Sequence, residues 1–360
     1  MTTTDIVAAA GRWFLCSAIR DTDGGVARYY RFDTQRYAPI STEISGYVAE
    51  VLVWLHKLTG DPAYRTAGVR SGHFLTRTAW DASVGAMPFE WPCTDGIPAV
   101  AYFFDSGIVA RGLLTLWRAT GEEEFLERAV AVAESMARDF QSDNGCWHAR
   151  LTLPSKEPLG PDARWSTQFV CHQLKGARAW QELAEITGQG RWRQLYEKVL
   201  RHALATHTSF LDGEPGERRM DRLHAYCYFL EGLLVAVDEP AVARVLREGL
   251  AEVSRRLREL ASLFERSDVW AQLLRLRLYA EGLGVAPLDR HLAEEEWARI
   301  QQFHLEHPDP RVNGAFAFGR KRGHLLPFAN PASTIFCLQA VEMWRRYLAG
   351  SFQPALCELI

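Results

Sequence analysis

The 360-residue chain lacks the features that mark several classes of protein. It has no run of about 18 or more apolar residues, so we expect no membrane-spanning helix. Its formal net charge is only -3 and no block of like charge occurs, which gives no electrostatic reason to expect nucleic acid or an anionic membrane surface as a partner. The N-terminal stretch MTTTDIVAAAGRWFLC has neither a basic start nor a sufficient apolar run, so we expect no signal peptide.

A disulfide framework is also absent from the pattern of cysteines. The chain has seven cysteines, an odd number without regular spacing. Scattered cysteines of this kind are typical of reduced thiols rather than of paired ones. Together with the missing signal peptide, they predict a cytoplasmic protein.

Motifs for common cofactors are missing as well. There is no glycine-rich phosphate loop, no Gly-x-Ser-x-Gly elbow and no aspartate-rich diphosphate motif, so we expect no cofactor. The pairs Cys171 with His172 and His224 with Cys227 are candidate zinc ligands. Their sequence contexts match those of known zinc sites poorly, and we therefore expect no metal.

Strand signals are scarce, and a repeated helical unit takes their place. Three segments share an apolar helix, a Thr-Gly stop and a second, more charged helix: residues 43–77, 105–140 and 168–204. The glycine after the threonine suits the left-handed position that ends a helix. Each segment therefore predicts an antiparallel pair of helices, the first one inside and the second one outside.

The rest of the chain continues this pattern less regularly. Residues 223–260 and 267–303 give two more pairs, and residues 331–350 give a last inner helix without a following partner. The helix expected over residues 4–19 fits that vacant position. The sequence thus predicts an all-α fold of six inner and six outer helices, closed into one ring-shaped domain over residues 1–360. The long connections would gather on one face, where binding and catalysis usually occur.

This arrangement of repeats resembles the (α/α)6 toroid of six-hairpin glycosidases, polysaccharide lyases and sugar epimerases. The resemblance covers nearly the whole chain but rests on no diagnostic motif. It implies a carbohydrate-active enzyme whose substrate is an oligosaccharide or polysaccharide fragment. The same toroid also serves terpene cyclases, prenyltransferases and thioether-forming peptide cyclases, so the fold alone does not decide the chemistry.

Two acids stand where a toroid would expose them, at the starts of neighbouring inner helices. Glu43 and Asp105 could hold their carboxyl groups across one sugar bond, as glycoside hydrolysis requires. The aromatic residues 102–104 would raise the pKa of Asp105 and suit it to be the general acid, with Glu43 as base or nucleophile. The resemblance to unsaturated glucuronyl hydrolases implies the same roles. The simpler alternative is that each acid only caps its helix.

Two other functions remain open from the sequence. His224 and Tyr226 near a helix start are suited to proton abstraction beside a uronate carboxyl, as in a polysaccharide lyase or an epimerase. A non-catalytic glycan-binding or scaffold protein of a polysaccharide biosynthesis system is the third hypothesis.

Aromatic, charged and histidine side chains near the helix starts and on the long connections are candidates for substrate binding. Tryptophans could stack on sugar rings, and arginines could bind an acidic group of the sugar. The candidates are Glu90, Trp91, Trp147, His148, Arg164, Trp165, Asp268, Arg311 and His324. The oligomeric state cannot be predicted.

Overall fold

A computed structural model describes residues 3–94, 96–143, 145–212 and 216–360. The other residues include 95, 144 and 213–215, which fall in three of the predicted connections and lie outside the described part. Within the described ranges the chain forms twelve α-helices and eleven strands of two to four residues. The chain divides into two compact units. Counting the helical hairpins in chain order, we call them the 1–3 unit, which holds hairpins 1 to 3, and the 4–6 unit, which holds hairpins 4 to 6. The 1–3 unit comprises residues 20–28 and 38–208 with Ile360, and the 4–6 unit comprises residues 1–19, 29–37 and 209–359.

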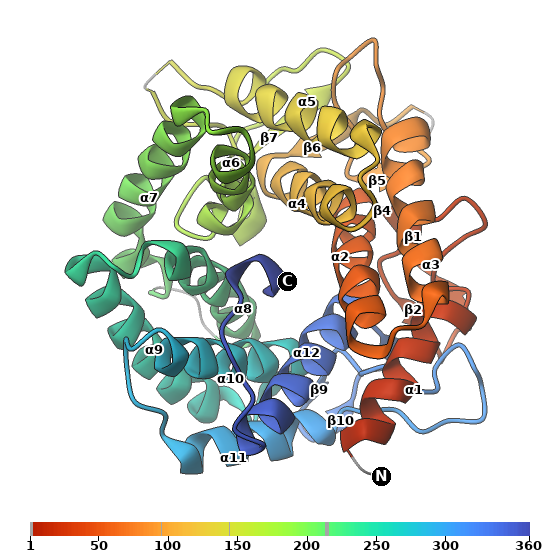
Figure 1. Cartoon of the computed structure of the whole chain (residues 1–360), viewed down its shortest axis with the longest axis vertical. Helices are drawn as coiled ribbons and strands as arrows, with labels where there is room; N and C mark the ends of the chain where they lie inside the picture. The colour runs from red at the N-terminus through yellow and green to blue at the C-terminus, as the bar shows by residue number, and fades with distance from the viewer. Residues whose placement is uncertain (1–2, 95, 144, 213–215) are drawn as a thin grey trace. The chain divides into compact units, whose positions relative to one another are not determined.

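The 1–3 unit contains three hairpins in chain order. Its inner helices pack side by side, α2 against α4 and α4 against α6, while α3 packs on α2 and α5 packs on α4 (Figure 1). The helices are α2 (Thr42–Thr59), α3 (Pro62–His73), α4 (Phe103–Thr120), α5 (Glu123–Asp139), α6 (Gln173–Thr187) and α7 (Gly190–Phe210). A six-residue π-helix, Phe74–Ala79, follows α3.

The turn inside each of these hairpins is built on the predicted glycine. Gly60, Gly121 and Gly188 end helices α2, α4 and α6 with φ of 74°, 73° and 67°. Each glycine donates its backbone N–H to a carbonyl of the preceding turn, as left-handed helix ends do. The Thr-Gly stops seen in the sequence are therefore confirmed.

The 4–6 unit repeats the arrangement with its own helices. Helix α10 packs against both α8 and α12, and α9 and α11 pack on α8 and α10. Helix α1 packs on α12, so the partner predicted for the last inner helix is confirmed. The helices are α1 (Thr3–Cys16), α8 (Glu217–Leu233), α9 (Pro240–Leu260), α10 (Ser267–Gly282), α11 (Arg290–Gln301) and α12 (Pro331–Leu348).

Two inner helices begin elsewhere than the apolar pattern indicated. Helix α6 begins at Gln173 rather than at Gln168, because the preceding residues include a short 3-10 turn, Trp165–Thr167. Helix α8 begins at Glu217, seven residues before His224. Its first residues are polar helix formers, which a search for apolar periodicity does not detect.

Short strands in the connections tie the hairpins together. In the 1–3 unit, β1 (Val26–Ala27), β4 (Ile40–Ser41) and β5 (Glu90–Trp91) form one antiparallel sheet, and β6 (Ala99–Tyr102) pairs with β7 (Arg150–Leu153). In the 4–6 unit the sheets have the orders β10-β9-β8 and β11-β2-β3. Their strands are β2 (Tyr30–Arg31), β3 (Arg36–Tyr37), β8 (Phe264–Arg266), β9 (Gly319–Lys321), β10 (His324–Leu325) and β11 (Phe328–Ala329).

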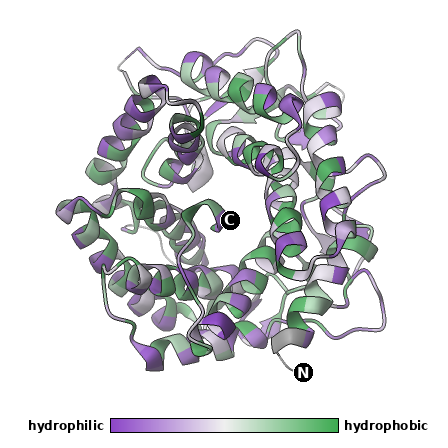
Figure 2. Cartoon of the chain, in the orientation of Figure 1, coloured by the Kyte–Doolittle hydropathy of each residue, from purple (hydrophilic) through white to green (hydrophobic). Residues whose placement is uncertain are grey.

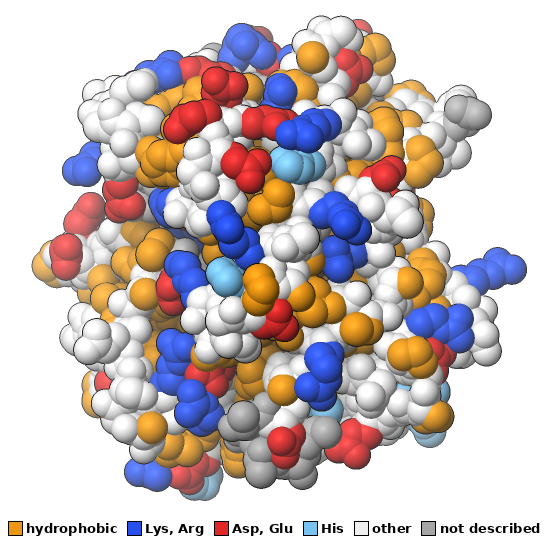
Figure 3. All heavy atoms as spheres, turned by 45° about the vertical axis from the view of Figure 1, so that its right-hand side comes forward, with side chains coloured by type: hydrophobic (Ala, Val, Ile, Leu, Met, Phe, Trp, Pro, Cys, Tyr) orange, Lys and Arg blue, Asp and Glu red, His pale blue; other side chains and the backbone are white. Residues whose placement is uncertain are grey.

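The outer helices are amphipathic, as expected for elements with one solvated face. In α9 the buried residues recur every three or four positions, and in α5 they do the same. Figure 2 shows hydrophilic and hydrophobic residues alternating along these helices. On the face drawn in Figure 3, basic and acidic side chains are interspersed rather than gathered by sign. Among the described residues, no helix is both long enough and apolar enough to cross a membrane.

Glycines bring the three inner helices of the 1–3 unit into backbone contact. A Cβ atom added at Gly107 of α4 would lie 2.2 Å from the carbonyl oxygen of Gly176 in α6. A Cβ at Gly112 of α4 would lie 2.6 Å from the carbonyl oxygen of Gly46 in α2. The spacing of α2, α4 and α6 is therefore set by main chain against main chain.

This contact predicts the effect of a single methyl group. Gly107→Ala must push α6 away from α4, and we expect it to lower the free energy of unfolding by roughly 1–3 kcal/mol or more. Gly190→Ala is the matched control, because a Cβ at Gly190, the first residue of α7, meets nothing within 4 Å. Urea denaturation of both variants measures the difference. Equal stability of the two variants would contradict the close contact.

Candidate active site

Two small sheets place the first turns of α2 and α4 in the 1–3 unit. Ser41 ends β4, pairs with both Val26 and Glu90, and caps α2 by accepting a hydrogen bond from the N–H of Ile44. Strand β6 runs directly into α4, and the N–H of Phe103 donates to the carbonyl of Ala149 just before β7. The two helix starts are thus fixed by backbone hydrogen bonds to the connections.

Glu43 and Asp105 lie in the first turns of these two helices, at the same level. Gly46, one turn after Glu43, packs on the backbone of Ile108 and Val109, one turn after Asp105. Glu50, farther along α2, pairs with Arg111, farther along α4. The two helices therefore run parallel. The two carboxyl groups consequently belong to the same end of two adjacent helices, where the charge of Glu43 acts on Asp105.

The pKa of each carboxyl group is raised by the site. Burial raises the pKa of Glu43 to about 7, against the lowering effects of Arg28 and Lys175. Burial raises the pKa of Asp105 well above its usual range, and the negative charge of Glu43 raises it further. Asp105 is only 9% exposed, and its Oδ2 has no hydrogen-bond partner among the described residues. The two carboxyl groups therefore titrate as an interacting pair that retains a proton at higher pH than isolated carboxyl groups do.

Neither acid is the cap of its helix. The N-cap residues of α2 and α4 are Ser41 and Tyr102, and the latter makes no side-chain capping bond. A carboxyl group that only capped its helix would accept backbone hydrogen bonds and have a lowered pKa. The simple capping interpretation therefore does not explain the environment of Glu43 and Asp105.

Arg28 and Lys175 supply positive charge to the same place. Arg28 follows β1 and donates from Nη1 to Glu90 Oε1 at 2.6 Å, with about two fifths of each side chain exposed. Its guanidinium also lies over the ring of Phe89. Lys175 of α6 is fully buried and its Nζ lies over the ring of Tyr47, 5.1 Å from the centroid. The site thus combines two acids with one accessible and one buried cation.

A change in the charge at Arg28 should move the titration of Glu43. Arg28 lowers the pKa of Glu43, so Arg28→Met should raise it further. If ionised Glu43 is needed for turnover, we expect the acidic limb of kcat/KM to move to higher pH by about one unit. Arg164→Met is the control, because Arg164 pairs with Asp162 instead. An unmoved limb in Arg28→Met would count against a role for ionised Glu43.

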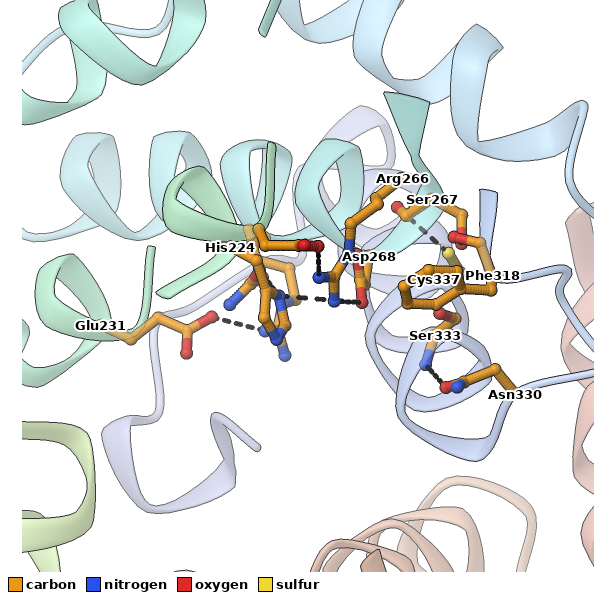
Figure 4. Close-up of polar contacts among 12 residues, drawn as sticks. His224, Glu231, Arg266, Ser267, Asp268, Phe318, Asn330, Ser333 and Cys337 are labelled. Carbon is orange, nitrogen blue, oxygen red and sulfur yellow. Dashed lines mark hydrogen bonds and ion pairs between the residues drawn. The ribbon is translucent and has the colours of Figure 1, made fainter. Parts of the chain in front are cut away.

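A second polar cluster lies in the 4–6 unit, around the first turn of α10 (Figure 4). Arg266 donates to both carboxylate oxygens of Asp268, at 3.0 and 2.7 Å, and to Asp221 at 2.8 Å. His224 Nδ1 lies 2.8 Å from Gln272 Oε1 and 3.7 Å from Asp268 Oδ2. With the amide oxygen as acceptor, Nδ1 of His224 carries the proton.

The imidazole of His224 is held in its neutral form. Burial lowers its pKa to about 3, and the positive charge of Arg266 lowers it as well, while Asp268 acts in the opposite direction. Asp268 itself is buried, and the Arg266 guanidinium holds the pKa of its carboxyl below the usual range despite burial. Asp268 is thus an ion-paired support for this cluster rather than a residue available to substrate.

The lowered pKa of His224 predicts a loss of stability in acid. An unfolded histidine has a pKa of about 6.5, so the unfolded state gains a proton first as pH falls from there toward 3. His224→Gln should therefore lose less stability than the wild type between about pH 7 and pH 4. The melting temperatures at both pH values measure this, with exposed His324→Gln as control. An equal acid sensitivity of wild type and His224→Gln would contradict the neutral buried imidazole.

The aromatic hydroxyl beside His224 belongs to Tyr228 and not to Tyr226. The rings of His224 and Tyr228 lie 4.5 Å apart. Tyr226 is buried, stacks with Phe210 and points toward Gly249 of α9. One helical turn separates positions 224 and 228, whereas position 226 lies on a different face. The pairing of His224 with Tyr226 is therefore corrected by the helix geometry.

The three predicted stacking tryptophans differ in their surroundings. Trp147 is 4% exposed and packs among Phe103, Phe169 and Trp180, so it is covered by other side chains. Trp165 is half-buried and meets the ring of His172 edge-on. Trp91 is half-buried and stands beside Glu90 on β5, which pairs with the strand that leads into α2. Of the three, Trp91 is therefore the one tied directly to the start of the helix that carries Glu43.

The predicted arginine and histidine binding residues differ in their surroundings. Arg164 and Arg311 each bind an acid two residues away, Asp162 and Asp309. His148 is half-buried at the end of the connection before β7, and His324 is exposed on β10 of the 4–6 unit. Among the residues described, no group of three or more His, Cys, Asp or Glu side chains is arranged to hold a metal ion.

Two residues of the site were missed by the sequence interpretation. Arg28 stands just after a short strand without any motif, and nothing in its neighbourhood distinguishes it from other arginines. Lys175 did leave a signal, since a lysine inside the apolar pattern of an inner helix is expected to be buried and partnered. Glu50 and Arg111 interrupt α2 and α4 in the same way, and both are buried.

The sequence has no match among protein-family models and none among curated proteins. Solved structures, however, are similar over nearly their whole length. A sugar epimerase from a ruminal bacterium has a TM-score of 0.72 at 11% identity, with 95% of this chain and 99% of that chain covered. A cellobiose 2-epimerase from Spirochaeta thermophila has a TM-score of 0.71 at 16% identity, covering 95% and 97%. An unsaturated glucuronyl hydrolase from a Bacillus species has a TM-score of 0.68 at 13% identity, covering 96% and 97%.

These similarities show the fold. The chain has the all-α fold of the (α/α)6 toroid, which it shares with these two epimerases and this hydrolase. The neighbours include epimerases and hydrolases at comparable scores, so the fold does not distinguish between these reactions.

Proposed function

We propose that the protein is a carbohydrate-active enzyme that hydrolyses a glycosidic bond with Asp105 and Glu43. The observation that supports this most directly is the pair of carboxyl groups at the same end of adjacent inner helices, one of them buried with an unbonded oxygen. Glycoside hydrolysis needs two carboxyl groups, one protonated as the general acid and one ionised as the base or nucleophile. The likeness to solved sugar epimerases and a glucuronyl hydrolase supports a sugar as substrate.

In this mechanism Asp105 donates its proton to the oxygen of the leaving sugar. Its buried, unbonded Oδ2 is the atom from which that proton is donated. Ionised Glu43 then either activates water or attacks the anomeric carbon. Arg28 stabilises the negative charge left on the pair after proton transfer, because it lowers the pKa of both acids. The substrate we propose is an oligosaccharide or polysaccharide fragment that carries a uronic acid.

A second candidate function rests on the His224 cluster. An imidazole with its Nδ1–H directed at Gln272 has its lone pair on Nε2, as proton abstraction in an epimerase or lyase requires. Its pKa of about 3 makes it a weak base in the substrate-free protein, and this favours hydrolysis by the carboxyl pair over proton abstraction by His224.

One experiment separates these functions. The purified protein is incubated with neutral and uronic-acid oligosaccharides, and the products are analysed for new reducing ends, for unsaturated uronate absorbance and for altered sugar stereochemistry. Hydrolysis yields new reducing ends without unsaturation, elimination yields both, and epimerisation yields neither bond cleavage nor unsaturation. Unchanged sugars throughout, with a ligand-dependent rise in melting temperature, would favour the glycan-binding alternative and oppose the proposed hydrolysis.

A further inference from the structure

A thiol and an imidazole meet in the 1–3 unit, apart from the carboxyl pair. Cys146 lies in the connection after α5, and His202 lies on α7. The Cys146 Sγ is 3.2 Å from His202 Nδ1, within hydrogen-bond distance for sulfur. Both residues are half-buried rather than enclosed in the core. Neither residue has a part in the proposed hydrolysis.

The other ring nitrogen of His202 fixes the direction of this hydrogen bond. His202 Nε2 lies 2.9 Å from the carbonyl oxygen of Phe169, which can only accept. The proton of a neutral His202 must therefore be on Nε2, and its Nδ1 offers a lone pair to the thiol of Cys146. When the thiol proton moves to Nδ1, the same contact becomes an ion pair of thiolate and imidazolium. Both protonation states satisfy both hydrogen bonds.

The surroundings hold this pair in place. The residue after Cys146 is Trp147, which is buried among aromatic side chains. Phe169 packs against the rings of both His202 and Trp147. The backbone of Cys146 is fixed as well, because its carbonyl accepts from the N–H of Ser142. A sulfur anchored at hydrogen-bond distance from an oriented base is the arrangement that activates cysteine nucleophiles.

We propose that Cys146 and His202 form a reactive thiol site that is modified by small soluble disulfides. In the reaction the sulfur of Cys146 attacks one sulfur of a disulfide R–S–S–R. The S–S bond of the reagent breaks, a mixed disulfide Cys146–S–S–R forms, and the leaving thiolate takes the proton from His202 as R–SH. Sulfur is neither gained nor lost, and a second thiol reverses the step.

The chain contains its own reference thiols for a test. Cys16, Cys93 and Cys357 are exposed, whereas Cys171, Cys227 and Cys337 are buried. Burial raises the pKa of Cys93, so Cys16 and Cys357 are the better references. If exposure alone decided the rate, both would react faster than half-buried Cys146. The proposal predicts the opposite order near neutral pH.

The experiment measures modification of each cysteine by oxidised glutathione and by iodoacetamide, with peptide mass spectrometry to resolve the sites. At about pH 7 we expect Cys146 to react roughly tenfold faster than Cys16 and Cys357. At about pH 9.5, where ordinary thiols ionise without help, the advantage should disappear. His202→Gln should abolish the advantage at neutral pH, whereas His148→Gln, a histidine close in sequence to Cys146, should leave it intact.

Two results would overturn the proposal. One is a rate for Cys146 at neutral pH that does not exceed those of Cys16 and Cys357. The other is an unchanged rate in folded His202→Gln. Labelling of the buried Cys171 reports whether a variant has unfolded, and if His202→Gln fails this check the pH profile of the wild type alone decides. The result is independent of sugar turnover.

Discussion

Replacing Asp105 with asparagine should abolish most of the turnover while leaving the protein at least as stable at alkaline pH. A general acid contributes roughly 10²- to 10⁴-fold to the rate, and a carboxamide at this position cannot give up the proton that the leaving sugar needs. We therefore expect kcat for Asp105→Asn to fall by about 10³-fold, with little change in substrate affinity. Turnover and binding are measured with whichever oligosaccharide the product analysis identifies.

The stability of the same variant follows from the raised pKa of Asp105. The native state favours the protonated carboxyl, so the wild type loses stability as pH rises above the pKa of an unfolded aspartate, about 3.9. The carboxamide of the variant does not titrate and escapes this loss. The melting temperature of Asp105→Asn relative to the wild type should therefore rise with pH. A capping aspartate would behave in the opposite way, since its loss would destabilise the helix.

Glu43→Gln tests the second carboxyl group of the pair. It should also lose turnover, and it removes the negative charge that raises the pKa of Asp105. Full activity in either variant would eliminate the carboxyl pair as the catalytic machinery. A change in sugar binding alone, without any turnover in the wild type, would indicate the non-catalytic protein instead.

Replacing Arg111 with methionine should cause the largest loss of stability. Arg111 is 1% exposed and binds Glu182 at 2.8 Å and Glu50 at 3.6 Å, both of which are buried as well. Without the guanidinium, Glu50 and Glu182 lose the cation that lies between them, and Glu182 keeps its ion pair with Arg118. Breaking a buried pair in this way costs about 3–5 kcal/mol of unfolding free energy. Urea denaturation at about pH 7 measures the loss.

Arg118→Met serves as the control for Arg111→Met. Arg118 binds the same Glu182 at 2.7 Å but is 29% exposed, so solvent replaces much of what it provides. The double variant Glu50→Gln, Arg111→Met should recover part of the stability, because Glu182 keeps Arg118 and the buried Arg178 as cationic neighbours. An Arg111→Met variant as stable as Arg118→Met would show that the buried network contributes little.

The hairpins could be predicted from the sequence because their signals are local. A Thr-Gly stop requires only neighbouring residues, and the glycines of α2, α4 and α6 adopt the left-handed conformation that the stops indicate. The start of α8 could not be located, because polar helix formers carry no apolar periodicity. The short strands were missed for a related reason, since two-residue strands are too short for alternation to be recognised.

The candidate site was only partly predictable, because it depends on contacts between distant residues. Glu43 and Asp105 could be proposed from their positions at helix starts. The pairing of β1 with β4 positions Arg28 near these two acids, and no local sequence pattern predicts that pairing. Trp147 illustrates the reverse case, because a tryptophan in a long connection looks available for sugar stacking until the aromatic cluster around it is known.

The backbone contacts of Gly46, Gly107, Gly112 and Gly176 bear on how this protein can change under selection. Where helices pack through side chains, each core substitution slightly alters the distance between the helices. The distance between site residues at the helix ends then changes as well. Here main chain rests on main chain, so mutations in the outer helices should leave the interval between Glu43 and Asp105 almost untouched. The connections that carry Arg28, Glu90 and Trp91 are then free to diversify. Under the proposed function, the reaction can stay constant while the preference for a particular sugar changes.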